Sequence, residues 1–174
     1  MKDKRTHILI IDVATSGFRV DLDTILEVAC IVCDGANLDI LDTCNYVVSQ
    51  PGTLEVPDFH QPLLRECGGP EARSMAAVEG LLLAGPWSAV DVLCNRALDF
   101  DLKFLLANMP DFHKAVTRSR PQLELKAFES LYVSGGGARF QSSMPRTYRA
   151  ADDAVAAYEE LAYYRDILLS GVTA

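Results

Sequence analysis

The chain has 174 residues, of which 49% are apolar and 23% charged, and this composition excludes a disordered chain. The formal net charge of −8 excludes a generally basic surface, so any contact with nucleic acid should be local, short or assisted by a metal ion. Apolar runs are too short to span a bilayer, and the charged amino terminus argues against a cleaved signal peptide. We expect one soluble intracellular domain over residues 1–174, cytoplasmic by default with an organelle left open, and no membrane partner.

The first half of the chain is rich in strand signals. Residues 7–13 form a continuous apolar run that includes a carboxylate near its end, which is typical of a strand buried on both faces. Runs over 24–33 and 41–48, joined by a turn-rich segment, complete an expected three-stranded meander. Residues 51–70 predict a loop with short structure, and 74–84 predict a helix packed back on the sheet.

The second half alternates a strand with helices. Residues 89–94 predict a fourth strand, and 99–107 predict a helix that ends before Pro110 because proline cannot continue it. A shorter helix is expected over 123–132, and the glycines that follow it break it. Strands followed by mixed helices predict an α/β domain with a mixed sheet.

The last predicted helix, over residues 150–169, has the clearest periodicity. Its apolar stripe contains Val155, Leu161, Tyr164 and Leu168. Glu159, Glu160, Arg165 and Asp166 lie mostly off this stripe and are expected on the polar face.

The five cysteines are an odd number scattered through apolar runs, which predicts core thiols and not a disulfide framework. Cys30 and Cys33 spell a C-x-x-C pair, but in a strand side chains three apart point to opposite faces. A zinc or redox role for this pair is therefore disfavoured.

Aspartates stand at the ends of three predicted elements: Asp12 ends the first strand, Asp101 follows the fourth, and Asp152 and Asp153 begin the last helix. Carboxylates brought together could hold two Mg²⁺ ions about 3.5–4 Å apart, which activate water and stabilise a leaving oxygen in phosphodiester hydrolysis. Taken singly, Asp101, Asp152 and Asp153 could equally cap a helix or complement its dipole.

Four segments carry a resemblance that decides between these interpretations. Residues 10–17 (IIDVATSG) resemble the first motif of the DEDD exonucleases, Asp-x-Glu-Thr/Met-Thr/Ser-Gly, and 25–29 (ILEVA) resemble its following strand. Residues 100–105 (FDLKFL) resemble the second motif. Residues 147–165, which begin TYRAADD, are similar to the end of oligoribonuclease.

The similarity extends over nearly the whole chain, with a loose fit only at 51–70 and 120–145. The resemblance to the oligoribonuclease-like DEDD family implies a ribonuclease-H-like exonuclease fold, a five-stranded mixed sheet flanked by helices and often assembled as a homodimer. It also implies 3′-to-5′ cleavage of short RNA with Mg²⁺ or Mn²⁺, for which Asp12, Asp101 and Asp153 would be the ligands.

Two residues depart from the family pattern. Ala14 stands where the first motif has a glutamate, and alanine has no oxygen to bind metal or to position water. Tyr148 stands where oligoribonuclease has a general-base histidine five residues before its last aspartate, a spacing that selects Asp153. Tyrosine-type relatives use Tyr-x-x-x-Asp instead, which would select Asp152. Ala14 is also what an engineered inactivation would leave, but that would not account for Tyr148.

Three further residues are candidates for substrate binding. Phe59 lies in the region where oligoribonuclease-like proteins place an aromatic that stacks on a terminal base, although a core role is equally compatible. Arg146 and Arg149 flank the third motif and could contact phosphate, although a solvated surface role is equally compatible.

Three functions remain open at this stage. The leading one is an oligoribonuclease-like exonuclease domain for short single-stranded RNA or nucleotides, with catalysis reduced or lost and Tyr148 orienting the water if any activity persists. The second is a pseudoenzyme without a metal cofactor that serves as a subunit of a larger complex, which the acidic composition and both losses favour. The third is an RNA-binding module without cleavage.

Overall fold

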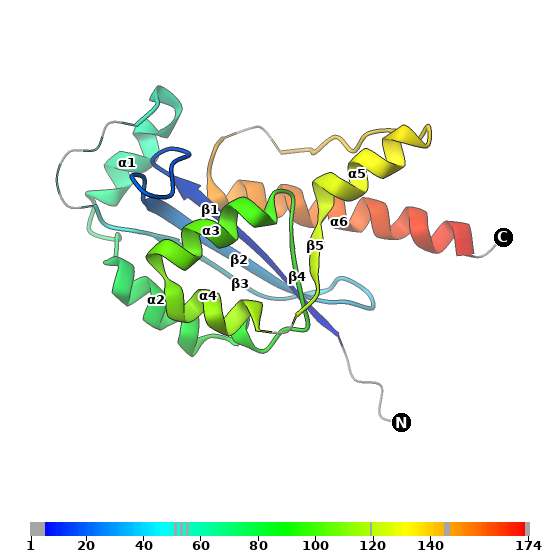
Figure 1. Ribbon diagram of the computed structural model, residues 1–174, viewed down its shortest axis with the longest axis horizontal. Helices are drawn as coiled ribbons and strands as arrows, with labels where there is room; N and C mark the ends of the chain where they lie inside the picture. Colours follow the sequence, from blue (N-terminus) through cyan, green and yellow to red (C-terminus); the bar gives the residue numbers. More distant parts are fainter. Residues whose placement is uncertain are drawn as a thin grey trace.

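The computed structural model describes residues 6–50, 52, 54, 56–118, 120–144 and 147–172, and it has one five-stranded mixed sheet flanked by helices (Figure 1). The sheet order is β3-β2-β1-β4-β5. The strands are β1 (His7–Thr15), β2 (Ile25–Asp34), β3 (Ile40–Val47), β4 (Val92–Asn95) and β5 (Gln122–Glu124). The first three form the predicted antiparallel meander, and β4 and β5 run parallel to β1. The predicted α/β class with a mixed sheet is confirmed.

Helices cover both faces of this sheet. The α-helices are α1 (Gln61–Cys67), α2 (Met75–Ala84), α3 (Leu98–Asn108), α4 (Pro110–Thr117), α5 (Leu125–Ser134) and α6 (Ala150–Val172). Two 3-10 turns are also present: η1 (Asp58–His60) directly precedes α1, and η2 (Pro86–Ser88) follows α2. Among the described residues, no helix is both long and apolar enough to cross a membrane.

The two faces of β1 and β2 have separate cores. Leu9 and Ile11 contribute to a cluster with α2, α3 and α4, and Ile10 contributes to a cluster with α1 and α6. Cys30 and Cys33 lie in different clusters, which confirms that the C-x-x-C pair points to opposite faces of the sheet. Asp12 and Ala14, which share the face of Ile10 in the strand alternation, therefore lie on the side that α6 covers (Figure 1).

The structure differs from the predicted elements at two places in the second half. Residues 122–124 form the short edge strand β5, placed by pairing with β4, and not the start of a helix. A separate helix, α4, begins directly at Pro110, whose missing N–H is not needed in a first turn. Glu79 of α2 accepts hydrogen bonds from the first-turn N–H groups of Asp111 and Phe112 at 2.9 and 3.0 Å and so caps the start of α4.

The polar face predicted for the last helix is wrong at one residue. Glu160 is 1% exposed, and its Oε2 accepts a hydrogen bond from Nη1 of Arg96 at 2.6 Å. Leu168, placed on the apolar stripe, is instead 54% exposed. The buried stripe is made by smaller side chains, those of Ala150, Ala154 and Ala157, with Leu161 and Tyr164 further along.

Candidate functional site

One amide group at the end of β4 joins an aspartate of β1 to an aspartate of α3. These strands are parallel, so their carboxyl ends meet at the same edge of the sheet. Asn95, the last residue of β4, donates from Nδ2 to Oδ1 of Asp12 at 2.9 Å and to Oδ2 of Asp101 at 2.7 Å. The other oxygen of Asp101, in the first turn of α3, accepts the backbone N–H of Val13 at 3.1 Å. Asp12 and Asp101 are therefore held within reach of a single nitrogen atom.

The charges of these carboxylates are poorly compensated. Burial raises the pKa of Asp101, which is 3% exposed, to about 7, although hydrogen bonds from Val13 and Asn95 act in the opposite direction. Burial also raises the pKa of Asp12 well above its usual value, and repulsion from Asp101 raises it further. Both carboxyl groups thus favour the protonated form more than a solvated aspartate does.

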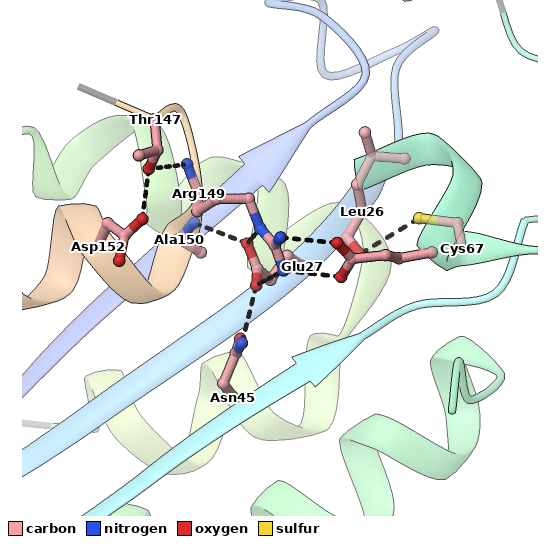
Figure 2. A network of polar contacts seen from close by, with 9 residues as sticks. Leu26, Glu27, Asn45, Cys67, Thr147, Arg149, Ala150 and Asp152 are labelled. Carbon is pink, nitrogen blue, oxygen red and sulfur yellow. Dashed lines mark hydrogen bonds and ion pairs between the residues drawn. The ribbon is translucent and has the colours of Figure 1, made fainter. Parts of the chain in front are cut away.

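The two aspartates at the start of α6 have different surroundings. The charge of Asp153 raises the pKa of both Asp12 and Asp101, so its carboxylate is electrostatically coupled to the pair. Asp152 instead accepts a hydrogen bond from Oγ1 of Thr147 at 2.5 Å (Figure 2). This arrangement favours Asp153 over Asp152 as the third member of the acidic group.

A buried glutamate lies directly opposite the departure at position 14. Glu27 of β2 is the cross-strand partner of Ala14 and is fully buried. Arg149 donates from Nε and Nη2 to its two oxygens at 3.0 and 2.8 Å. The backbone N–H of Ala150 and the amide of Asn45 each donate to it at 2.8 Å (Figure 2). Glu27 is thus a fully hydrogen-bonded carboxylate that also caps the first N–H of α6.

Arg149 connects this glutamate to α1. Its Nη1 and Nη2 also donate to Glu66 at 2.9 and 3.0 Å, so the guanidinium lies between two carboxylates. Hydrogen bonds to Glu27 raise the pKa of Arg149 above its usual value. We call Glu27, Glu66 and Arg149 the glutamate clamp; it fixes the segment before α6 against β2 and α1.

Tyr148, which precedes the clamp arginine, has an unusual backbone. Its φ of 59° lies in the left-handed region, which is rare for a bulky residue and is found disproportionately at functional sites. Its ring stacks on Phe59, with centroids 4.2 Å apart and planes 29° from parallel. Phe59 is 43% exposed, so the stack is accessible from solvent.

The predicted site residues therefore fall into three groups. Asp12 and Asp101 share the amide of Asn95, and the charge of Asp153, which is exposed at the start of α6, acts on both; we call these three residues the acidic group. Tyr148 pairs with Phe59, and Arg149 belongs to the glutamate clamp. The predicted contact of Arg149 with phosphate stays a prediction, and Arg146 lies outside the described residues.

The hydrogen-bond partners of these groups are not among the site residues predicted from the sequence. Asn95 came one residue after the predicted fourth strand, so its position at a strand end was the available signal. Glu27 lies within one of the segments that resemble the family, and an acidic residue inside an otherwise apolar strand is itself a signal of a buried ion pair. Glu66 carried no signal of its own.

The residues present do not fit a two-ion metal centre in this arrangement. Among the described residues, no group of three or more His, Cys, Asp or Glu side chains is positioned to hold a metal ion. Ala14 also supplies no oxygen ligand at the position where the resemblance expects a glutamate.

Comparison with known proteins relates the fold, but not the sequence, to nucleases. No family model matches the chain. No curated protein matches it either. The structure is similar to E. coli exonuclease I in complex with a 5cy-dA13 oligonucleotide, with a TM-score of 0.64 and 15% identity over 88% of this chain and 39% of that one.

Two other solved structures extend this similarity. The zinc-bound E. coli exonuclease I–ssDNA complex has a TM-score of 0.66 and 14% identity, over 91% of this chain and 40% of that one. Cell-death related nuclease 4 has a TM-score of 0.57 and 16% identity, over 92% of this chain and 64% of that one. This chain thus spans 39–40% of the length of these exonuclease I chains. The five-stranded mixed sheet flanked by helices is the ribonuclease-H-like exonuclease fold of these nucleases.

Proposed function

We propose that this domain binds short single-stranded nucleic acid, RNA in particular, as an oligoribonuclease-like 3′-to-5′ exonuclease domain in which hydrolysis is reduced or lost. The fold supports the exonuclease part, and structural neighbours were solved with single-stranded oligonucleotides. The net charge of −8 limits the contact to a short strand, because the surface as a whole repels a polyanion.

The observation that carries this proposal is the coupled acidic group of Asp12, Asp101 and Asp153. Burial raises the pKa of Asp12 and Asp101, and the charge of Asp153 raises it further in both; perturbed carboxylates in a nuclease fold are candidates for a functional site. The accessible Phe59–Tyr148 stack supplies the second requirement, an aromatic surface on which a terminal base can stack.

The two departures from the family pattern, Ala14 and Tyr148, support the proposal that hydrolysis is reduced. A positioned general base contributes about 10²–10⁴-fold to rate, and a tyrosine at 148 replaces the expected histidine. Ala14 removes a carboxylate where the resemblance expects one, and the neighbouring Glu27 is engaged in the glutamate clamp. If hydrolysis persists in this proposal, Mg²⁺ or Mn²⁺ is the required cofactor and Tyr148 orients the water.

Binding and hydrolysis of a 5′-labelled RNA dinucleotide test the proposal. Wild type should bind it in a fluorescence anisotropy titration but cleave it slowly. The double variant Ala14→Glu/Tyr148→His should cleave much faster than wild type. Each single variant should gain much less, because a general base without the missing carboxylate contributes little to the rate. The matched control adds Asp12→Asn to the double variant, which should remove the restored cleavage.

Three results would count against this function. A wild type that cleaves as fast as the double variant would mean that Tyr148 suffices and that catalysis is intact. A double variant that binds Mn²⁺ yet neither binds nor cleaves RNA would mean that the substrate groove is absent. A wild type that binds no RNA and co-purifies in a defined complex would favour the subunit role. Light scattering on the same samples tests the homodimer expected from the resemblance.

A further inference from the structure

Two cysteines stand directly opposite each other on neighbouring strands. Cys30 of β2 pairs with Cys44 of the edge strand β3 in the antiparallel register. Cys30 belongs to the core cluster with α2, α3 and α4, and Cys44 packs against that cluster. The other cysteines, Cys33, Cys67 and Cys94, lie in the cluster on the opposite face. All five are free thiols in the structure, so Cys30 and Cys44 face each other as two thiols on one side of the sheet.

The spacing of this pair suits a disulfide. Val48 donates its backbone N–H to the carbonyl of Leu26, its opposite residue, at 2.8 Å. Hydrogen-bonded pairs alternate along an antiparallel ladder, so Cys30 and Cys44 form one as well, with Cα atoms about 5.5 Å apart. Disulfides span about 4.4–6.8 Å between Cα atoms.

A disulfide at this position would be strained. Directly opposed Cβ atoms lie about 4.5–5.5 Å apart, slightly more than the roughly 3.5–4.5 Å of a relaxed disulfide. The two strands must therefore draw together for the bond to form. Strained disulfides are more easily reduced than relaxed ones, so the bond should be reversible.

The two thiols differ in their access to solvent. Cys30 is fully buried, whereas Cys44 is half-buried. Burial raises the pKa of the Cys30 thiol well above its usual value, and a hydrogen bond with the Cys44 thiol raises it further. An oxidant from solution should therefore react first with Cys44, and Cys30 is in contact as the second thiol.

We propose that Cys30 and Cys44 form a reversible redox site, at which a small-molecule disulfide such as oxidised glutathione oxidises both thiols and links β2 to β3. The thiolate of Cys44 attacks one sulfur of the oxidised glutathione, releases one reduced glutathione and leaves a mixed disulfide. The sulfur of Cys30 then attacks the sulfur of Cys44 and releases the second glutathione. The two protein thiols lose two electrons and two protons, which convert the oxidised glutathione into two molecules of its thiol.

The bond would fasten the edge strand beside the glutamate clamp. Asn45, which follows Cys44, donates its amide to Glu27 of the clamp at 2.8 Å. β3 pairs with β2 on one side only, so a covalent link restricts the separation of these two strands. The link also closes a short loop in the unfolded chain, which favours the folded state. This inference goes beyond the proposed function, because it concerns the thiols of the sheet and holds whether or not the domain binds RNA.

Counting thiols before and after incubation with oxidised glutathione tests the site. Denatured wild type should lose two of its five thiols, and its intact mass should fall by two hydrogens without a glutathione adduct. Cys33→Ser, a change in the same strand on the opposite face, is the matched control and should lose the same two thiols. Cys44→Ser should lose none. Cys30→Ser should lose one and carry one glutathione, because the mixed disulfide on Cys44 has no second thiol to resolve it.

Peptide mapping and melting temperature complete the test. Cleavage before aspartates separates residues 23–33 from residues 42–57, and these peptides should be linked in oxidised wild type and in oxidised Cys33→Ser. The oxidised protein should melt about 5 °C higher than the reduced one, and excess reduced glutathione should reverse the shift. Cys44→Ser should show no shift.

Three results would overturn the inference. Wild type that keeps all its thiols would show that the pair does not react, and an equal loss of thiols in Cys44→Ser would place the reaction elsewhere. A link that excess reduced glutathione does not break would contradict reversibility. If Cys30→Ser does not fold, Cys44→Ser still decides the question, because its side chain is half-buried and serine is nearly the same size.

Discussion

Buried carboxylates at this end of the sheet differ in whether a positive charge lies beside them. Glu27 receives a full positive charge from Arg149 and further hydrogen bonds from Asn45 and the start of α6. Asp12 and Asp101 instead accept hydrogen bonds from the neutral amide of Asn95, and Asp101 also accepts the backbone N–H of Val13. Burial accordingly raises the pKa of both aspartates.

This difference separates a structural carboxylate, Glu27, from the aspartates that we propose as functional. A buried ion pair whose hydrogen bonds are satisfied is costly to break. Buried carboxylates without a neighbouring positive charge instead lower the stability of the folded state. The glutamate clamp also anchors the residue before α6, and α6 carries Asp153, so the structural group positions part of the acidic group. The comparison therefore predicts large stability effects at the clamp and pH effects at the aspartates.

The largest effect should come from Arg149→Met, which keeps much of the side-chain volume and leaves Glu27 buried without its countercharge. Breaking a buried pair from one side costs about 3–5 kcal/mol, and we expect a loss of this order in the free energy of unfolding. Urea denaturation measures it. Arg19→Met is the matched control: its pair with Asp21, 3.6 Å long, is exposed to solvent and should contribute less than about 1 kcal/mol. Equal losses in the two variants would contradict a structural role for the clamp.

A smaller effect should appear in the pH dependence of stability without divalent ions. The folded-state pKa of Asp101 is about 7 and the unfolded value about 3.8, so the folded state binds more protons between these values. Stability contributed by protonated Asp101 is therefore present below about pH 4 and is lost as the pH rises towards 7.

Asp101→Asn removes this contribution, because asparagine does not titrate. The free energy of unfolding of the variant relative to wild type should increase as the pH rises from about 4 to 7, by a few kcal/mol at most. Thermal and urea unfolding in EDTA across this range measure the difference. Asp166→Asn, at an exposed carboxylate, should keep a constant difference. A constant difference for Asp101→Asn as well would show that its carboxyl group is adequately compensated.

Most of the fold could be predicted from the sequence because its central strands are buried apolar runs. β1 and β2 are recognisable from their own residues, and Ser74 and Pro110 mark element boundaries chemically. β5 has only three residues and depends on pairing with β4, and α4 depends on a cap from Glu79. Such elements are defined by partners distant in sequence, which local patterns do not contain.

The site divides in the same way. The motif residues Asp12 and Asp101 could be selected because their types and positions resemble a known family. The hydrogen-bonded pairings of this region could not be predicted, because their members are distant in sequence: Asn95 and Asp12 are 83 residues apart, and Glu27 and Arg149 of the clamp are 122 apart. Burial of Glu160 was likewise hidden, because its partner Arg96 belongs to β4's following loop and not to the helix.

The smallest effect on stability should come from Phe59→Ala, which tests the ring of Tyr148 separately from its backbone. The glutamate clamp fixes the backbone next to Tyr148, whereas Phe59 contacts the ring of Tyr148, with ring centroids 4.2 Å apart. An aromatic pair of this kind contributes about 0.5–1.5 kcal/mol beyond burial, so we expect a loss near this size by urea denaturation.

The same variant should have a larger effect on RNA binding than on folding. Stacking of a base on an aromatic side chain contributes about 1–3 kcal/mol, so the affinity of Phe59→Ala for a dinucleotide should fall measurably by fluorescence anisotropy. Phe59→Leu is the matched variant, because it keeps an apolar side chain while removing the flat ring. It should recover most of the stability but little of the affinity. If Phe59→Ala destabilised the fold as much as Arg149→Met, the aromatic stack and not the glutamate clamp would hold this segment.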